Sequence, residues 1–111
     1  MEYFELSLPS QAVTLAAPAP GNTTDVLCGV VASGNLEILV EAHSGADVRF
    51  MVETAADGFR ETWDAVLTQF AGSHASGGLT FTMNDVGSTP AVVALRLAQA
   101  HESWLRAGSR A

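Results

Sequence analysis

The sequence predicts an α+β fold in which two helices pack on one face of a mainly antiparallel sheet of about four strands. Strands are indicated by short stretches in which every second residue is apolar. Helices are indicated by two stretches in which apolar residues recur every three to four positions. The chain has 111 residues, 48% of them hydrophobic and 15% charged, so it is long enough to bury one core.

Composition divides the chain into three segments. Residues 1–24 combine a short N-terminal edge strand with a connector rich in proline and alanine, which favours an irregular path over the surface. Residues 25–107 carry the regular strand and helix patterns, and we expect them to form the main domain. Residues 108–111 form a short C-terminal tail that we expect to fray.

A hairpin is the most regular feature of the main domain. Residues 26–31 form a continuous apolar run of strand length, and residues 36–41 alternate between apolar and mostly acidic side chains. Between them lies the tip Ser33-Gly34-Asn35, and glycine and asparagine accept the positive φ angles of tight turns. Such a turn lifts the Ser33 hydroxyl to the end of the sheet. Most serines at such tips only form the turn, and that interpretation stays open here.

Alternation over residues 48–53 predicts a third strand, and residues 43–46 form the turn that precedes it. The charged residues of these strands lie on the polar face of the predicted sheet. We expect Glu37 and Glu41 to face Arg49 across neighbouring strands, and each pair to contribute about 0.3 kcal/mol to the free energy of unfolding.

The first helix follows the third strand. Its apolar stripe has the spacing i, i+4, i+7, i+8 and i+11, which places all members on one face. The stripe consists of Phe59, Trp63, Val66, Leu67 and Phe70. Asp57 precedes the stripe and is the predicted N-cap of this helix.

A fourth strand and a second helix complete the pattern. Residues 79–84 alternate and predict the strand. Thr89 is the predicted N-cap of the last helix and Pro90 its first residue, because proline is favoured at that position. The face expected to pack on the sheet consists of Val93, Leu97, Ala100 and Trp104.

Charge and composition exclude several classes of function. The formal net charge is −7 and the chain has no lysine, which argues against binding nucleic acid or an anionic membrane surface. The acidic balance is compatible with docking onto basic patches of other proteins. No apolar run is long enough to span a membrane, and the start lacks a signal-peptide pattern. Together with the single cysteine, Cys28, expected to be a small buried hydrophobe, this favours a cytoplasmic protein.

Standard catalytic signatures are absent from the sequence. His43, His74 and His101 are spread over two loops and a helix without a second ligand at metal spacing, so we expect no metal site. Asp85 ends the fourth strand and is expected to bond its own turn more readily than to act as a general base. Spacing alone does not exclude a small hydrolase in which Ser33 pairs with a loop histidine. We therefore predict no catalytic residue, with that hydrolase as an alternative.

Two stretches resemble one known family. Residues 31–41 (VASGNLEILVE) resemble the attachment-site hairpin of the malonate decarboxylase acyl-carrier subunit, the delta subunit of that complex. Residues 85–100 (DVGSTPAVVALRLAQA) are similar to the C-terminal helix of the same family and the turn before it. The two motifs occur in the family's order and separation, and the resemblance extends from about residue 25 to residue 104. A similar carrier is a subunit of citrate lyase, which is the nearest confusable family.

The resemblance implies a non-catalytic carrier. The serine at the hairpin tip, here Ser33, carries phosphoribosyl-dephospho-CoA through a phosphodiester, and Gly34 and Asn35 complete the attachment site. The terminal thiol of this group holds an acetyl residue that is exchanged for malonyl, and decarboxylation regenerates the acetyl thioester. Separate acyl transferase and decarboxylase subunits perform that chemistry, and a prosthetic-group transferase and a malonyl transferase are further partners. The family commonly has aspartate where this chain has Asn35.

Two alternatives remain at this stage. One is the carrier subunit of a citrate lyase-like complex. The other is a binding or assembly module in which Ser33 is only a turn residue. Replacement of Ser33 by alanine separates carrier from module, because only a carrier needs the hydroxyl.

Overall fold

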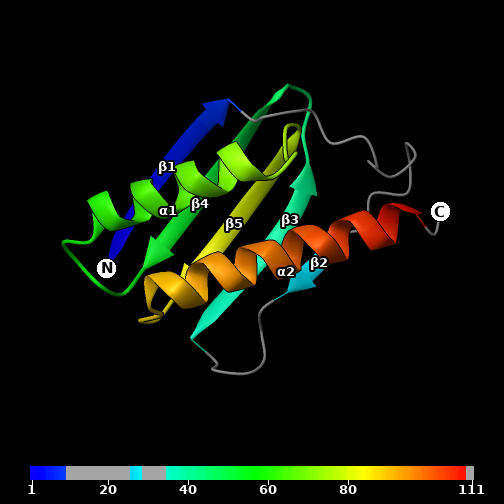
Figure 1. Ribbon diagram of the computed structural model, residues 1–111. Helices are drawn as coiled ribbons and strands as arrows, with labels where there is room; N and C mark the ends of the chain where they lie inside the picture. Colours follow the sequence, from blue (N-terminus) through cyan, green and yellow to red (C-terminus); the bar gives the residue numbers. More distant parts are fainter. Residues whose placement is uncertain (10–25, 29–34, 110–111) are drawn as a thin grey trace.

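The computed structural model describes residues 1–9, 26–28 and 35–109. Within these residues, five strands form one sheet and two helices cover one of its faces (Figure 1). In chain order the elements are β1 (Glu2–Pro9), β2 (Val26–Cys28), β3 (Leu36–Ala42), β4 (Asp47–Thr54), α1 (Arg60–Ser73), β5 (Leu79–Asp85) and α2 (Pro90–Ser109). The predicted α+β class, with both helices on one face, is confirmed, and the sheet has five strands where about four were expected.

The strand order is β1-β4-β5-β3-β2. Three of the neighbouring pairs are antiparallel, and β4 and β5 are parallel. A parallel pair needs a crossover connection, and α1 supplies it between β4 and β5. The sheet is therefore mainly antiparallel, as predicted. The edge strand predicted near the N-terminus is β1, which pairs along its whole length with β4.

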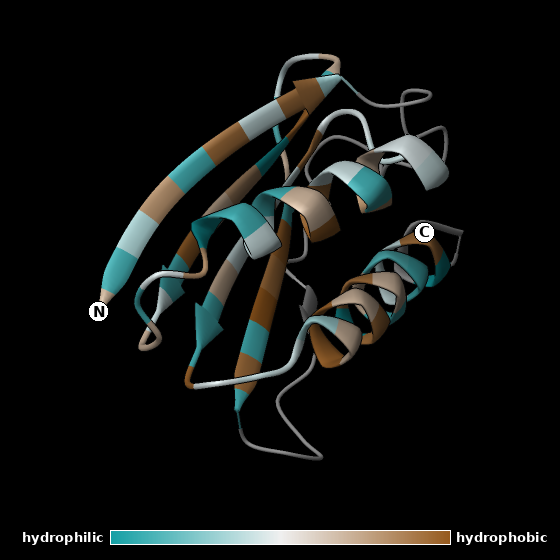
Figure 2. Ribbon diagram, turned by 60° about the vertical axis from the view of Figure 1, so that its left-hand side comes forward, coloured by the Kyte–Doolittle hydropathy of each residue, from teal (hydrophilic) through white to brown (hydrophobic). Residues whose placement is uncertain are grey.

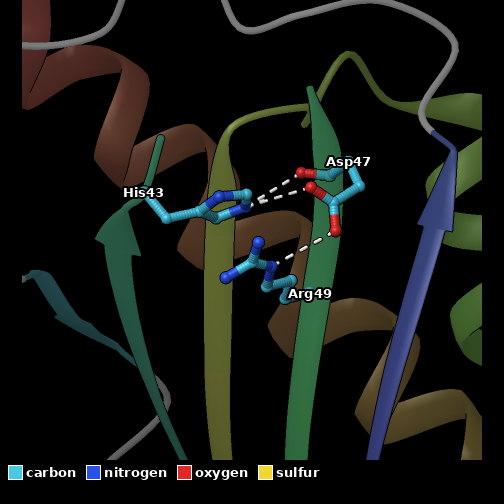
Figure 3. A network of polar contacts seen from close by, with 3 residues as sticks. All are labelled: His43, Asp47 and Arg49. Atoms are coloured by element: carbon cyan, nitrogen blue, oxygen red, sulfur yellow. Dashed lines mark hydrogen bonds and ion pairs between the residues drawn. The ribbon is translucent and has the colours of Figure 1, made fainter. Parts of the chain in front are cut away.

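The predicted pairing of Glu37 and Glu41 with Arg49 is wrong because β5 lies between β3 and β4. Thr80 of β5 stands opposite Glu41 on one side and opposite Arg49 on the other. The Arg49 guanidinium instead donates from Nε to Asp47 Oδ2 at 3.2 Å (Figure 3). Strands β3 and β4 follow one another in the chain but are not neighbours in the sheet.

The core lies between the sheet and the helices. Buried and more exposed residues alternate along β4 and β5, so that one face of the sheet is apolar. The ribbon in Figure 2 shows hydrophobic and hydrophilic residues following one another along these long strands. Phe50, Phe70 and Phe81 join β4, α1 and β5 at its centre, with ring centroids 5.3–6.1 Å apart. Val66 of the predicted helical stripe is partly buried against this core. The other predicted inward-facing residues that are buried are Leu36, Ile38, Val40, Val48, Val52, Leu79, Met83, Trp63, Leu67, Val93, Leu97, Ala100 and Trp104.

The helix starts test two predicted caps. Helix α2 begins at Pro90, and Thr89 Oγ1 accepts a hydrogen bond from the Val92 amide at 3.3 Å, which confirms the predicted cap. Helix α1 begins after Phe59, which makes no side-chain capping bond. Asp57 is therefore not the N-cap; its carboxylate lies 3.3 Å from the N-terminal amine of the chain.

A turn at Gly58 explains this difference. Gly58 has φ 86°, a left-handed conformation that redirects the chain between Asp57 and the helix. Phe59 consequently stands outside the first helical turn and is 54% exposed, so it does not join the buried stripe.

At the other end of the chain, α2 continues to Ser109. The predicted start of the tail at residue 108 thus falls in the last turn of α2.

Candidate functional site

Of the three predicted site residues, the structure describes Asn35, which lies at one end of the sheet. Ser33 and Gly34, the first two residues of the predicted turn, lie outside the described residues. Asn35 is described and exposed, directly before the first residue of β3. Its backbone carbonyl accepts a hydrogen bond from the Val86 amide at 2.8 Å. Asn35 is therefore anchored to the turn that leads from β5 into α2.

The two strands on either side of the predicted tip pair as expected. Strands β2 and β3 are antiparallel, with Val26 opposite Val40 and Cys28 opposite Ile38. Ser33 is the fifth residue after Cys28 and the fifth before Ile38, so it stands at the midpoint of the connection. The pairing of the two predicted hairpin strands is thus confirmed over residues 26–28 and 38–40.

Asp85 holds this end of the sheet together. Its side chain is 4% exposed. The Thr54 hydroxyl donates to Oδ2 at 2.8 Å, and the Ser88 amide donates to Oδ1 at 2.7 Å. Thr54 is fully buried, and its Oγ1 also accepts from the Ala56 amide at 3.2 Å. This confirms that Asp85 bonds its own turn, and it shows in addition that the carboxylate ties the end of β4 to the start of α2.

A pocket of about 350 Å³ opens beside Asp85. Its walls come from the first half of α1, the start of α2 and the turns that precede both helices. Most of the lining is apolar, contributed by Ala56, Phe59, Trp63, Val66, Pro90 and Val93. The other lining residues are Thr62, Asp85, Gly87, Ser88 and Thr89. Asp85 is the one ionisable side chain among them, and Ser88 Oγ is buried without a hydrogen-bond partner in the described part of the chain.

His43 lies at the opposite end of the sheet. There the turn between β3 and β4 passes the start of β5, and the His43 amide donates to the Gly78 carbonyl at 2.8 Å. The His43 Nε2 atom lies 2.9 Å from the Asp47 carbonyl oxygen and 4.0 Å from a carboxylate oxygen of Asp47 (Figure 3). This network closes a turn and is remote from Asp85.

The other two histidines form an aromatic cluster with Phe70. The His74 ring stacks on Phe70 at 4.3 Å between centroids, and the His101 ring meets Phe70 edge-on at 5.9 Å. His101 is 7% exposed, and its Nε2 lies 3.0 Å from the Ala75 carbonyl oxygen. Burial lowers the pKa of His101, a hydrogen bond to the Ala75 backbone acts in the opposite direction, and the neighbouring His74 lowers it further.

The arrangement of these groups decides what chemistry they support. Both oxygens of Asp85 accept hydrogen bonds from Thr54 and Ser88, and neither donor is a histidine, so no histidine–aspartate pair is built here. Among residues 1–9, 26–28 and 35–109, no group of three or more histidine, cysteine, aspartate or glutamate side chains is arranged to hold a metal ion. No helix in this described part has both the length and the apolar character needed to cross a membrane.

Sequence reasoning did not find the pocket. Its lining residues come from positions 56–66 and 85–93, and half of α1 and most of β5 lie between these two segments. A usable signal was the break at Gly58, because it leaves Phe59 outside the helical stripe. The turn at 85–88 was identified, although its contact with Asn35 was not.

Comparison with known proteins gives consistent matches over most of the chain. Residues 23–104 match the family model described as "ACP: Malonate decarboxylase delta subunit (MdcD)". The chain is 50% identical over 101 residues to the malonate decarboxylase acyl carrier protein of Acinetobacter calcoaceticus, covering 90% of this chain and 93% of that protein. It is 46% identical over 100 residues to the malonate decarboxylase acyl carrier protein of Burkholderia cepacia, and this match covers 90% of this chain and 87% of that protein.

A solved structure gives the same indication. The fold matches one chain in the crystal structure of a Pseudomonas malonate decarboxylase hetero-tetramer in complex with malonate. The TM-score is 0.70 at 27% sequence identity, and the match covers 94% of this chain and 99% of that chain.

Proposed function

Because the chain belongs to the malonate decarboxylase delta subunit family, we propose that it is the acyl carrier protein of a malonate decarboxylase complex. The observation that carries the proposal is the family match over residues 23–104, which spans both stretches singled out in the sequence. The crystallised relative is part of a hetero-tetramer, which supports other subunits of the complex as partners. We place this complex in the cytoplasm, in agreement with the single cysteine.

We assign the covalent attachment of phosphoribosyl-dephospho-CoA to Ser33. Ser33 is at the midpoint between the paired residues Cys28 and Ile38, and its neighbour Asn35 is exposed at the end of the sheet. Gly34 adds no side chain beside the hydroxyl. When bound, the group supplies a flexible arm with a terminal thiol that holds acetyl or malonyl residues as thioesters.

The chain's own residues fit the role of a support. The Asn35 carbonyl is bonded to the Val86 amide, and Asp85 ties the same turn to Thr54, so the base of the tip rests on the end of a rigid sheet. We assign acyl transfer and decarboxylation to the acyl transferase and decarboxylase subunits. We assign attachment of the group to a prosthetic-group transferase, and malonyl loading to a malonyl transferase. A flexible arm raises the effective concentration of its cargo at each of these sites in turn.

Intact mass measurement tests the attachment. The chain is co-produced with the enzymes that make and attach the prosthetic group, and its mass is followed by peptide mapping. We expect a mass increase equal to phosphoribosyl-dephospho-CoA, or its acetylated form, on the peptide that contains Ser33. The Ser33→Ala variant loses this increase. The Ser44→Ala variant keeps it, because it removes an exposed serine from a different turn.

An unmodified mass in the presence of demonstrably active attachment enzymes contradicts the proposal and favours the binding module. The variant Asn35→Asp then restores the residue common in the family. Loading that appears only in this variant traces the failure to recognition of the tip.

A further inference from the structure

The pocket beside Asp85 lies at the same end of the sheet as Asn35. The start of β3, the end of β5 and the start of α2 meet there (Figure 1). Val86, whose amide bonds to the Asn35 carbonyl at 2.8 Å, is followed in the chain by Gly87 and Ser88, and both of these line the pocket. Asn35 is thus hydrogen-bonded to Val86, the residue directly before the pocket-lining Gly87.

The chemistry of the lining defines the ligand that it accepts. Trp63, Val66 and Val93 give apolar walls, and the volume of about 350 Å³ is within the range of small-molecule pockets. Ser88 lines the pocket, and its Oγ is a buried hydroxyl without a partner in the described residues, so rotation about its Cα–Cβ bond would bring it to a polar atom of a ligand. Among the described residues, the lining contains no basic side chain and one carboxylate, that of Asp85. A neutral and partly apolar ligand is accepted, whereas an anionic one meets a fixed negative charge.

We propose that this pocket receives the end of the carrier's own prosthetic arm while that end is neutral, as the free thiol or the acetyl thioester, and excludes it as the malonyl thioester. The inference rests on the proposed function, because it takes the arm attached at Ser33 as the occupant. As a consequence, the acyl group decides where the end of the arm lies. The acetyl thioester binds in the pocket of the carrier, and the malonyl thioester stays outside it and accessible to partner subunits.

Tethering makes weak binding sufficient. Ser33 is two residues before Asn35, so two peptide units, about 7 Å when fully extended, separate the attachment point from a residue bonded to the pocket turn. A flexible tether of this kind gives an effective concentration in the millimolar range. A pocket that binds the free arm with a Kd of about 1 mM is therefore about half occupied when the arm is attached.

The test uses the free arm as a probe on the full-length, unloaded chain. S-acetyl-pantetheine and S-malonyl-pantetheine are titrated in turn, and the amide signals of Gly87 and Ser88 and the indole signal of Trp63 are followed by NMR. We expect saturable shifts with a Kd of about 1 mM for the acetyl probe, and binding weaker by at least about tenfold for the malonyl probe. No saturable shift at these residues overturns the proposal, as does equal binding of both probes.

Variants separate the pocket from the rest of the surface. Val66→Phe fills the pocket from α1 and abolishes the shifts caused by the acetyl probe. Ala65→Phe adds the same ring at the preceding, exposed position, which does not line the pocket, and it leaves those shifts unchanged. Thermal unfolding establishes that both variants are folded. Equal effects of the two variants overturn the assignment.

The source of the selectivity is tested at Asp85. Asp85→Asn keeps an acceptor for the Ser88 amide and removes the charge, so the malonyl probe should approach the acetyl probe in affinity. An unchanged ratio between the probes overturns the role of the carboxylate. The mass measurement on Ser33 separates the two proposals. If the probe binds but Ser33 is not modified, only the pocket as a binding site is supported. If Ser33 is modified but no probe binds, only the carrier function is supported.

Discussion

Replacing Thr54 by valine tests the hydrogen bonds that hold the site end of the sheet. Thr54 is fully buried and donates to Asp85 Oδ2 at 2.8 Å. A hydrogen bond to a charged group contributes about 1.5–3 kcal/mol, and its loss leaves a buried carboxylate oxygen without a donor. Valine has nearly the shape of threonine, so packing changes little. The Ala56 amide also loses its acceptor, but it is only part-buried and water can replace it. We expect Thr54→Val to lower the free energy of unfolding by about 2–3 kcal/mol.

Thr54→Ser is the matched control. It keeps the hydroxyl and removes one methyl group from a buried site, which costs about 1 kcal/mol. Equilibrium unfolding in urea measures both variants, and a loss of 2–3 kcal/mol lowers the midpoint by about 1–2 M for a domain of this size. A Thr54→Val variant within about 0.5 kcal/mol of the unsubstituted protein, or a serine variant destabilised as much as the valine variant, would refute this role of the Thr54 hydroxyl.

Two further predictions concern α2. Thr89→Ala removes the hydroxyl that accepts from the Val92 amide and should cost about 1 kcal/mol in thermal unfolding, whereas Thr89→Ser should not; equal losses in both would argue against the cap. Burial lowers the pKa of His101 in the folded protein, so the unfolded chain takes up a proton at a higher pH than the folded protein does. The free energy of unfolding therefore decreases as the pH falls below about 7, until the pH has passed the lower pKa of the folded protein. His101→Gln should reduce this slope in urea titrations between about pH 5 and 8, and parallel curves for the two proteins would contradict it.

Local patterns determined the elements and the faces that they bury. In β3, the alternation of apolar and acidic residues predicted that Ile38 and Val40 are buried and that Glu37 is exposed, and all three are so placed. The Thr89-Pro90 pair marked the start of α2 correctly. These successes share a cause: alternation, helical spacing and capping depend on residues within a few positions of each other, so a single sequence contains the whole signal.

The tertiary structure decided the order of the strands and the shape of the site. The insertion of β5 between β3 and β4 removed the expected partner of Glu41, and the left-handed turn at Gly58 moved the start of α1 away from Asp57. Strand order depends on which distant segments bury the most surface together, and no single strand carries that information. The pocket forms only where the starts of α1 and α2 lie close together, next to the hydrogen bonds that Asp85 accepts from Thr54 and Ser88. The sequence by itself therefore determined the family and the elements, while only the packing of distant segments placed a pocket beside Asp85.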